Sequence, residues 1–122
     1  MGLIDTRDIA AVAAAALTED GHNGRIYELT GPEPLSNQEA AAKLSKALGR
    51  EVAFVPVPDQ AAYQAMLGMG MPADYVWSLT TLNQAGRKGA ADVATQTVEL
   101  VTGKPPRTLD AFFAEHLAAF KN

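Results

Sequence analysis

Apolar residues recur at helical spacing in several segments of this chain of 122 residues, and short apolar runs lie between those segments. From Asp8 to Thr18 the larger apolar side chains fall on one stripe of an alanine-rich stretch, so we predict a helix there, capped by the carboxylate of Asp8. Ser36 and Glu39 have the spacing of a capping box, which predicts a second helix that ends at Gly49.

The second half of the chain also has helical patterning. We predict helices over 59–67 and 72–84, with a Gly-Met-Gly-Met-Pro segment between them that ends the first and starts the second. A short helix follows within 93–101, and Thr108 is expected to cap a last helix that carries an apolar face.

Three apolar runs are too short for helices and predict β-strands near residues 3–5, 25–30 and 51–57. The strand–helix–strand order of the second and third runs favours a parallel pair with a right-handed crossover. The predicted fold class is therefore α/β and helix-dominated, with two or three short strands and five or six helices in a single domain over residues 1–122.

Composition narrows the function classes. Charged residues make up 20% of the chain, its formal net charge is −4, and it has no basic cluster of the kind that tracks a phosphate backbone, so we expect no nucleic-acid partner. No apolar run is long enough to span a bilayer, and we expect a cytoplasmic protein without membrane contact. The chain has no cysteine and two histidines, which excludes disulfides and makes a metal site of its own side chains improbable.

Three sequence segments together resemble one protein family: Asp5-Thr6-Arg7-Asp8-Ile9-Ala10, Tyr27-Glu28-Leu29-Thr30-Gly31-Pro32 and Leu100-Val101-Thr102-Gly103-Lys104-Pro105-Pro106-Arg107-Thr108. Their order is similar to that in the C-terminal, substrate-side portion of NmrA-like, atypical short-chain dehydrogenases/reductases. The resemblance implies a fragment of a Rossmann-type fold whose dinucleotide-binding part precedes this segment and is missing here. It also implies an NAD(P)-linked oxidoreductase or redox-sensing regulator, in which this region walls the substrate cleft.

Two sequence motifs that such reductases use for cofactor binding and proton transfer are missing from the sequence. The Gly-rich segment Gly68–Ala73 approaches the dinucleotide fingerprint in spacing, but it is predicted between two helices rather than between a strand and a helix. None of Tyr27, Tyr63 and Tyr75 has a lysine four residues later, as the Tyr-x-x-x-Lys pair of many such reductases requires. We therefore expect the chain alone to bind no cofactor and to transfer no hydride.

One aromatic and methionine-rich stretch is the best candidate for a binding site. Thioether and aromatic side chains suit an adaptable pocket wall or an interface, and the alternative is simple packing of two short helices. We predict that this stretch binds a small-molecule substrate through Tyr63, Met66, Met69, Met71, Tyr75 and Trp77.

Other readings stay open at this stage. A non-enzymatic module that binds a small molecule or a protein is the main alternative. A weaker one is a hydrolase-type activity in a dimer-interface pocket with His116 or His22 as the base, although a packed histidine and a solvated loop explain these residues as well. Because the helix from Asp8 and the strand over 25–30 would lack the cover they have in the family, we also expect a homodimer or domain-swapped pair.

Overall fold

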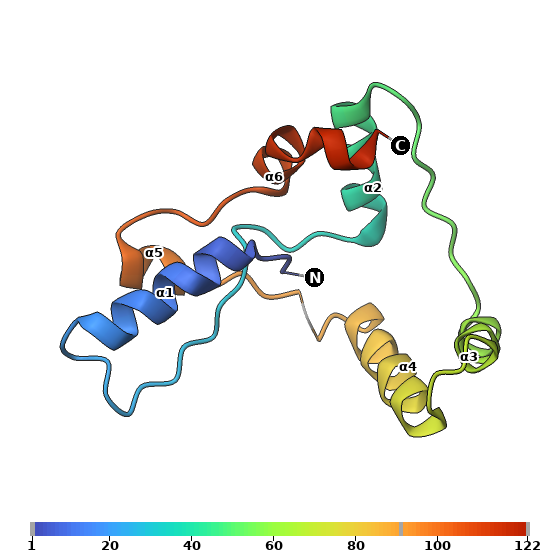
Figure 1. The fold of residues 1–122 in the computed structure, drawn as a ribbon, viewed down its shortest axis with the longest axis horizontal. Helices are drawn as coiled ribbons and strands as arrows, with labels where there is room; N and C mark the ends of the chain where they lie inside the picture. The colour runs from blue at the N-terminus through green and yellow to red at the C-terminus, as the bar shows by residue number, and fades with distance from the viewer. Residues whose placement is uncertain (1, 91, 122) are drawn as a thin grey trace. The chain divides into compact units, whose positions relative to one another are not determined.

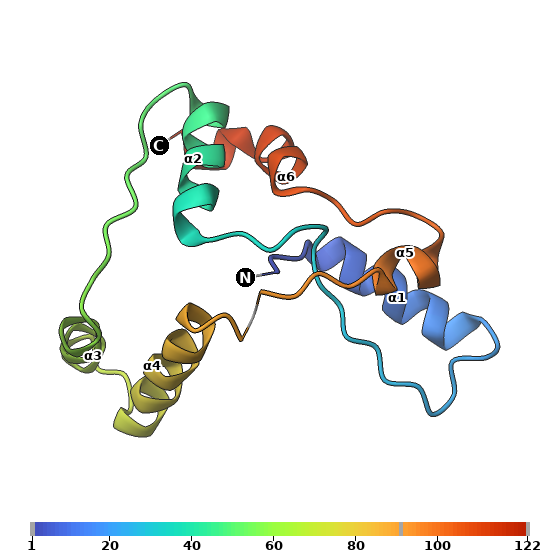
Figure 2. The ribbon, with the colours of Figure 1, turned by 180° about the vertical axis from the view of Figure 1, so that it is seen from behind.

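The computed structural model describes residues 2–90 and 92–121, and within these residues it contains six α-helices and one short 3-10 helix (Figures 1 and 2). They are α1 (Thr6–Thr18), α2 (Asn37–Leu48), α3 (Asp59–Gly68), α4 (Ala73–Arg87), α5 (Thr97–Thr102), α6 (Leu109–Glu115) and the 3-10 helix Leu117–Phe120.

The helices belong to two compact units. The first consists of Met1–Ala53 together with Asp92–Asn122, and in it α1 packs against α5 while α2 packs against α6. The second, Phe54–Ala91, is a hairpin in which α3 packs against α4. None of the helices that the structure describes has both the length and the apolar character needed to cross a bilayer.

The strands predicted near residues 3–5, 25–30 and 51–57 are wrong, because residues 2–90 and 92–121 contain no β-strand. A strand requires a neighbouring backbone to pair with. Here backbone N–H groups of the extended segments donate to side chains instead: the Thr95 N–H donates to Thr30 Oγ1 at 2.8 Å, and the Val52 N–H donates to Ser45 Oγ of α2 at 2.9 Å. The described residues therefore form an α-rich structure, and the predicted α/β fold class is corrected.

Gly31 allows two of these extended segments to meet. A Cβ atom at this position would lie 1.7 Å from the backbone oxygen of Leu3, far inside any permitted contact. The glycine of the Leu29-Thr30-Gly31-Pro32 segment is therefore required by the close approach of another part of the backbone, as glycines often are.

The helix caps test the sequence analysis directly. The capping box is confirmed, since the Glu39 N–H donates to Ser36 Oγ at 3.2 Å and the Ser36 N–H donates to Glu39 Oε2 at 2.8 Å. The prediction that Asp8 caps α1 is wrong. The helix begins at Thr6 and its cap is Asp5, whose carboxylate accepts from the Arg7 N–H at 2.8 Å.

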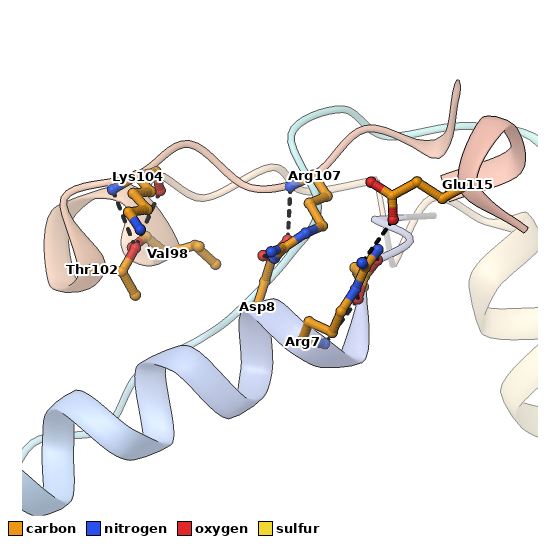
Figure 3. Close-up of polar contacts among 8 residues, drawn as sticks. Arg7, Asp8, Val98, Thr102, Lys104, Arg107 and Glu115 are labelled. Atoms are coloured by element: carbon orange, nitrogen blue, oxygen red, sulfur yellow. Dashed lines mark hydrogen bonds and ion pairs between the residues drawn. The ribbon is translucent and has the colours of Figure 1, made fainter. Parts of the chain in front are cut away.

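Asp8 instead joins α1 to a distant part of the first unit (Figure 3). It is only 4% exposed, accepts a 2.7 Å hydrogen bond from the Arg107 N–H, and also pairs with the Arg107 guanidinium. Next to it, Arg7 bridges Asp5 at 2.6 Å and Glu115 of α6 at 2.7 Å. The Asp-x-Arg-Asp sequence therefore has a structural role, holding the start of α1 against the segment that leads into α6.

Candidate functional site

The candidate site lies on the α3–α4 hairpin. Pro58 and Pro72 each occupy the position before a helix, where the missing N–H of proline removes no hydrogen bond from the helix. Between the helices, the Met71 N–H donates to the Met66 carbonyl at 3.3 Å, and Gly70 takes a φ of 83°. The Gly-Met-Gly-Met-Pro sequence thus forms the tight turn that brings the two helices together.

One side of α4 faces α3. The Val76 side chain is fully buried, and Asp59 at the start of α3 accepts a 3.0 Å hydrogen bond from Gln84 and pairs with Arg87. These contacts fix the orientation of α4 about its own axis. Successive residues of an α-helix are rotated by about 100° about its axis, so the directions of the remaining α4 side chains follow from this orientation.

The structure divides the predicted binding residues into two groups by exposure. Tyr63, Met66 and Met71 are half-buried in the hairpin, which fits the packing alternative for these three side chains. Met69 in the turn and Trp77 on α4 are 75% and 64% exposed. Together with Tyr75, they are the exposed members of the predicted set.

Tyr75 does not join Trp77 on one face. It is 56% exposed, and two residues along a helix correspond to a rotation of about 200°. Tyr75 and Trp77 come directly before and after the fully buried Val76, so they project on opposite sides of α4. A single ligand in contact with Trp77 would not contact Tyr75 on the same helix.

Both histidines contact an aromatic side chain. His22 Nδ1 lies 2.7 Å from the hydroxyl of Tyr27, and the ring of His116 packs at a tilt of 57° against Phe112, with ring centroids 4.6 Å apart. In the part of the chain that the structure describes, neither ring is hydrogen-bonded to a serine or threonine hydroxyl, and no group of three metal-binding side chains is present. The hydrolase alternative therefore has no geometry in its favour here.

The Gly-rich segment Gly68–Pro72 is not arranged like a dinucleotide-binding turn. A dinucleotide is held where a Gly-rich turn links a strand to a helix, so that the helix N-terminus meets the pyrophosphate. Gly68–Pro72 links α3 to α4, and its backbone amides are used within the hairpin turn.

Lys43 is a polar residue that the sequence analysis missed. Its ammonium lies 2.5 Å from Asp110 and 3.0 Å from Glu33, beside an open hollow of about 690 Å³ between α2 and α6. These carboxylates raise the pKa of Lys43, while Lys43 lowers that of Asp110. Because the two charged partners lie far from Lys43 in sequence, no local pattern indicates this cluster.

Comparisons with known proteins place the chain in a family, although no protein-family model matches it. NAD(P)H azoreductase from Xenophilus azovorans is 45% identical over 117 residues, which are 96% of this chain and 41% of the azoreductase. The crystal structure of NADPH-dependent quinone oxidoreductase from Escherichia coli, complexed with NADPH, is similar with a TM-score of 0.79 and 29% identity over 96% of this chain and 42% of that one. A nucleoside-diphosphate-sugar epimerase from Staphylococcus aureus gives a TM-score of 0.81 at 25% identity, covering 93% of this chain and 39% of its own.

The chain belongs to this NAD(P)-binding reductase family and corresponds to the C-terminal part of its members, as the sequence resemblance implied. It spans about 41% of the length of the first curated relatives that it matches. The azoreductase uses NAD(P)H by its name, the quinone oxidoreductase is NADPH-dependent, and NADPH is present in the Escherichia coli structure.

Proposed function

We propose that this chain forms the substrate-side part of an NAD(P)H-dependent reductase, in which the exposed surface of the α3–α4 hairpin contacts a small planar electron acceptor. The observation that carries the proposal is the 45% identity to an NAD(P)H azoreductase over nearly the whole chain. The azo and quinone groups in the names of the relatives are conjugated acceptors, and we take that chemical class as the substrate class.

The geometry of the hairpin supports a role in binding. Trp77 and Met69 are large apolar side chains that the hairpin leaves exposed, although Val76 beside Trp77 is fully buried. An indole ring gives a flat surface for stacking, and a thioether adapts to the shape of a ligand. Half-buried Tyr63, Met66 and Met71 would then support this surface from inside the hairpin.

The proposal assigns the cofactor to another part of the reductase. We propose that these residues bind no nicotinamide cofactor alone, because the Gly-rich segment closest in spacing to the dinucleotide fingerprint, Gly68–Ala73, lies between two helices. Exposed apolar side chains on the first unit also support a missing nucleotide-binding part. Leu17 of α1 and Ile26, in the segment predicted as a strand, are both largely exposed. We propose that the nucleotide-binding part packs there.

Trp77 provides the test, because it is the only tryptophan in the sequence. The purified chain is titrated with menadione as a quinone probe, and tryptophan emission is recorded with correction for absorbance. The proposal predicts quenching that saturates, and predicts that Met69→Ala weakens the apparent affinity several-fold. Leu100→Ala, which removes an exposed apolar side chain from α5 in the other unit, is the control and should leave the titration unchanged.

Linear quenching, equal to that of free N-acetyltryptophanamide, would contradict the proposed contact between Trp77 and the acceptor. An equal loss of affinity in both variants would also contradict it, since a site on the hairpin should not respond to a change on α5.

A further inference from the structure

The loop after α1 contains the only asparagine in the sequence that is followed by a glycine, Asn23-Gly24. The Arg25 N–H donates to the His22 carbonyl at 3.1 Å, which closes a β-turn with Asn23 and Gly24 at its centre. Gly24 takes a φ of 72°, as the third residue of a type II turn does, and Asn23 is exposed. The turn therefore presents this dipeptide to water.

The fold does not hold the peptide unit between Asn23 and Gly24. Among the described residues, its carbonyl accepts no hydrogen bond, its N–H donates none, and the Asn23 side chain makes none. A Cβ atom at Gly24 would meet nothing within 4 Å, so no neighbouring atoms crowd the unit. Rotation of this peptide unit breaks no hydrogen bond of its own, and it brings the Gly24 nitrogen towards the Asn23 side chain.

Two other asparagines provide a contrast within the same chain. Asn37 and Asn83 are also exposed, but Asn37 is the first residue of α2, Asn83 lies inside α4, and a glutamine follows each of them. A helix fixes the backbone dihedral angles, and a side chain on the next residue obstructs its nitrogen. Exposure alone does not distinguish the three asparagines, whereas backbone freedom and the following glycine single out Asn23.

We propose that Asn23 is a site of spontaneous deamidation in the folded chain, since asparagine is a thermolabile residue. Hydroxide removes the proton of the Gly24 N–H, and the nitrogen attacks Cγ of Asn23. The new N–Cγ bond closes a succinimide ring, the Cγ–Nδ2 bond breaks, and the amide nitrogen takes a proton from water and leaves as ammonia. Water then opens the ring at either carbonyl, which gives aspartate or isoaspartate without oxidation or reduction of any atom.

The modification changes the loop in two ways. It adds one negative charge beside Glu19 and Asp20, in a chain whose formal net charge is −4. The isoaspartate form also lengthens the main chain by one carbon atom inside the turn, so the hydrogen bond from the Arg25 N–H to the His22 carbonyl is lost. The proposal does not depend on the reductase function, because it uses only the chemistry of this loop.

Peptide mapping by mass spectrometry tests the assignment. The full chain is incubated in mildly alkaline buffer, samples are taken over several weeks and digested with pepsin at acidic pH, and the conversion of each amide to a carboxylate is quantified. The proposal predicts that Asn23 is deamidated at least about tenfold faster than Asn37 and Asn83. Equal rates at the three sites, or an unmodified Asn23 in the last sample, would overturn the proposal.

Gly24→Ala gives a test that a folding defect cannot imitate. It should slow deamidation of Asn23 about tenfold, because the new Cβ atom obstructs the attacking nitrogen. Alanine is strained at a φ of 72°, so the variant also loosens the turn, and loosening alone would speed the reaction. A rate equal to that of the unsubstituted chain, or higher, would overturn attack by the Gly24 nitrogen.

Gln38→Gly separates the contribution of the fold from that of the dipeptide, since it places a glycine after Asn37 in the first turn of α2. The proposal predicts that Asn37 of this variant reacts several-fold more slowly than Asn23 in the folded chain. In concentrated urea, where the helix is lost, the two rates should become equal. Equal rates in the folded chain would show that the loop does not select Asn23, and would overturn the proposal.

Discussion

The carboxylate of Asp8 and the backbone N–H of Arg107 are joined by a 2.7 Å hydrogen bond across 99 residues of sequence. The pair links the first turn of α1 to the loop before α6, and the Arg107 side chain adds an ion pair to the same carboxylate. In the first unit of this chain, this contact holds the Asp-x-Arg-Asp segment and the Pro-Pro-Arg-Thr segment together.

Replacement of Asp8 by alanine should therefore lower the free energy of unfolding by about 1–3 kcal/mol, because it leaves the Arg107 N–H without its partner. The urea midpoint measures this change. Asp20→Ala removes an exposed acid from the loop after α1 and should change stability by less than about 0.5 kcal/mol. Equal effects of the two substitutions would contradict the role given to Asp8.

Gly31→Ala should destabilise the first unit by about 1–3 kcal/mol, since the new Cβ atom would overlap the Leu3 backbone oxygen and force the segments apart. In contrast, Gly68→Ala adds a methyl group in open space at the end of α3 and should be neutral or slightly stabilising. Thermal melts followed by circular dichroism distinguish the two. Similar melting temperatures for both variants would show that the two segments do not approach at Gly31.

Ser36→Ala should cost about 1 kcal/mol, because it removes the acceptor for the Glu39 N–H at the start of α2. Ser78 of α4 provides the control: its hydroxyl donates to the Asp74 carbonyl within a helix that is already formed, so Ser78→Ala should be nearly neutral. Chemical denaturation of the two variants side by side measures the difference, and a neutral Ser36→Ala would argue against the capping box.

Acid should destabilise the chain in a defined range of pH. Hydrogen bonds from the Arg7 side chain and backbone lower the pKa of Asp5 from 3.8 to about 2. Above 3.8 the carboxylate is ionised in both states and its stabilisation is complete. As the pH falls from 3.8 towards 2, the unfolded state takes up the proton first, so this contribution is lost.

Asp5→Asn isolates that effect, because asparagine also caps helices but carries no charge. The dependence of the urea midpoint on pH should be shallower in the variant between about pH 4 and pH 2. It should not vanish, since the pKa values of Asp110 and Glu39 are lowered as well, by Lys43 and by the Ser36 backbone. An unchanged slope would contradict the assignment to Asp5.

Local sequence patterns predicted the local structure of this chain well. The capping box at Ser36, the Thr108 cap and the break between α3 and α4 depend on neighbouring residues, and the structure has all three. The strands were predicted from the same kind of local pattern and are absent from the described residues. Strand formation needs a paired backbone, which no local pattern supplies.

The other differences between the sequence predictions and the structure arise from contacts between residues that are distant in sequence. The N-cap of α1 is Asp5 and not Asp8, whose carboxylate pairs with Arg107 instead, and nothing near Asp8 in the sequence indicates that partner. Likewise, the stretch around Trp77 was recognisable by its residue types. The division of this stretch into half-buried and exposed side chains depends on how α4 packs against α3.

Direct binding of NADPH by the purified chain, measured by isothermal titration calorimetry, tests the central claim that these residues form the substrate-side part of a reductase whose cofactor is held elsewhere. We predict no saturable heat of binding with NADPH, and saturable quenching of Trp77 by menadione in the same preparation. Stoichiometric binding of NADPH to this chain alone would contradict the claim.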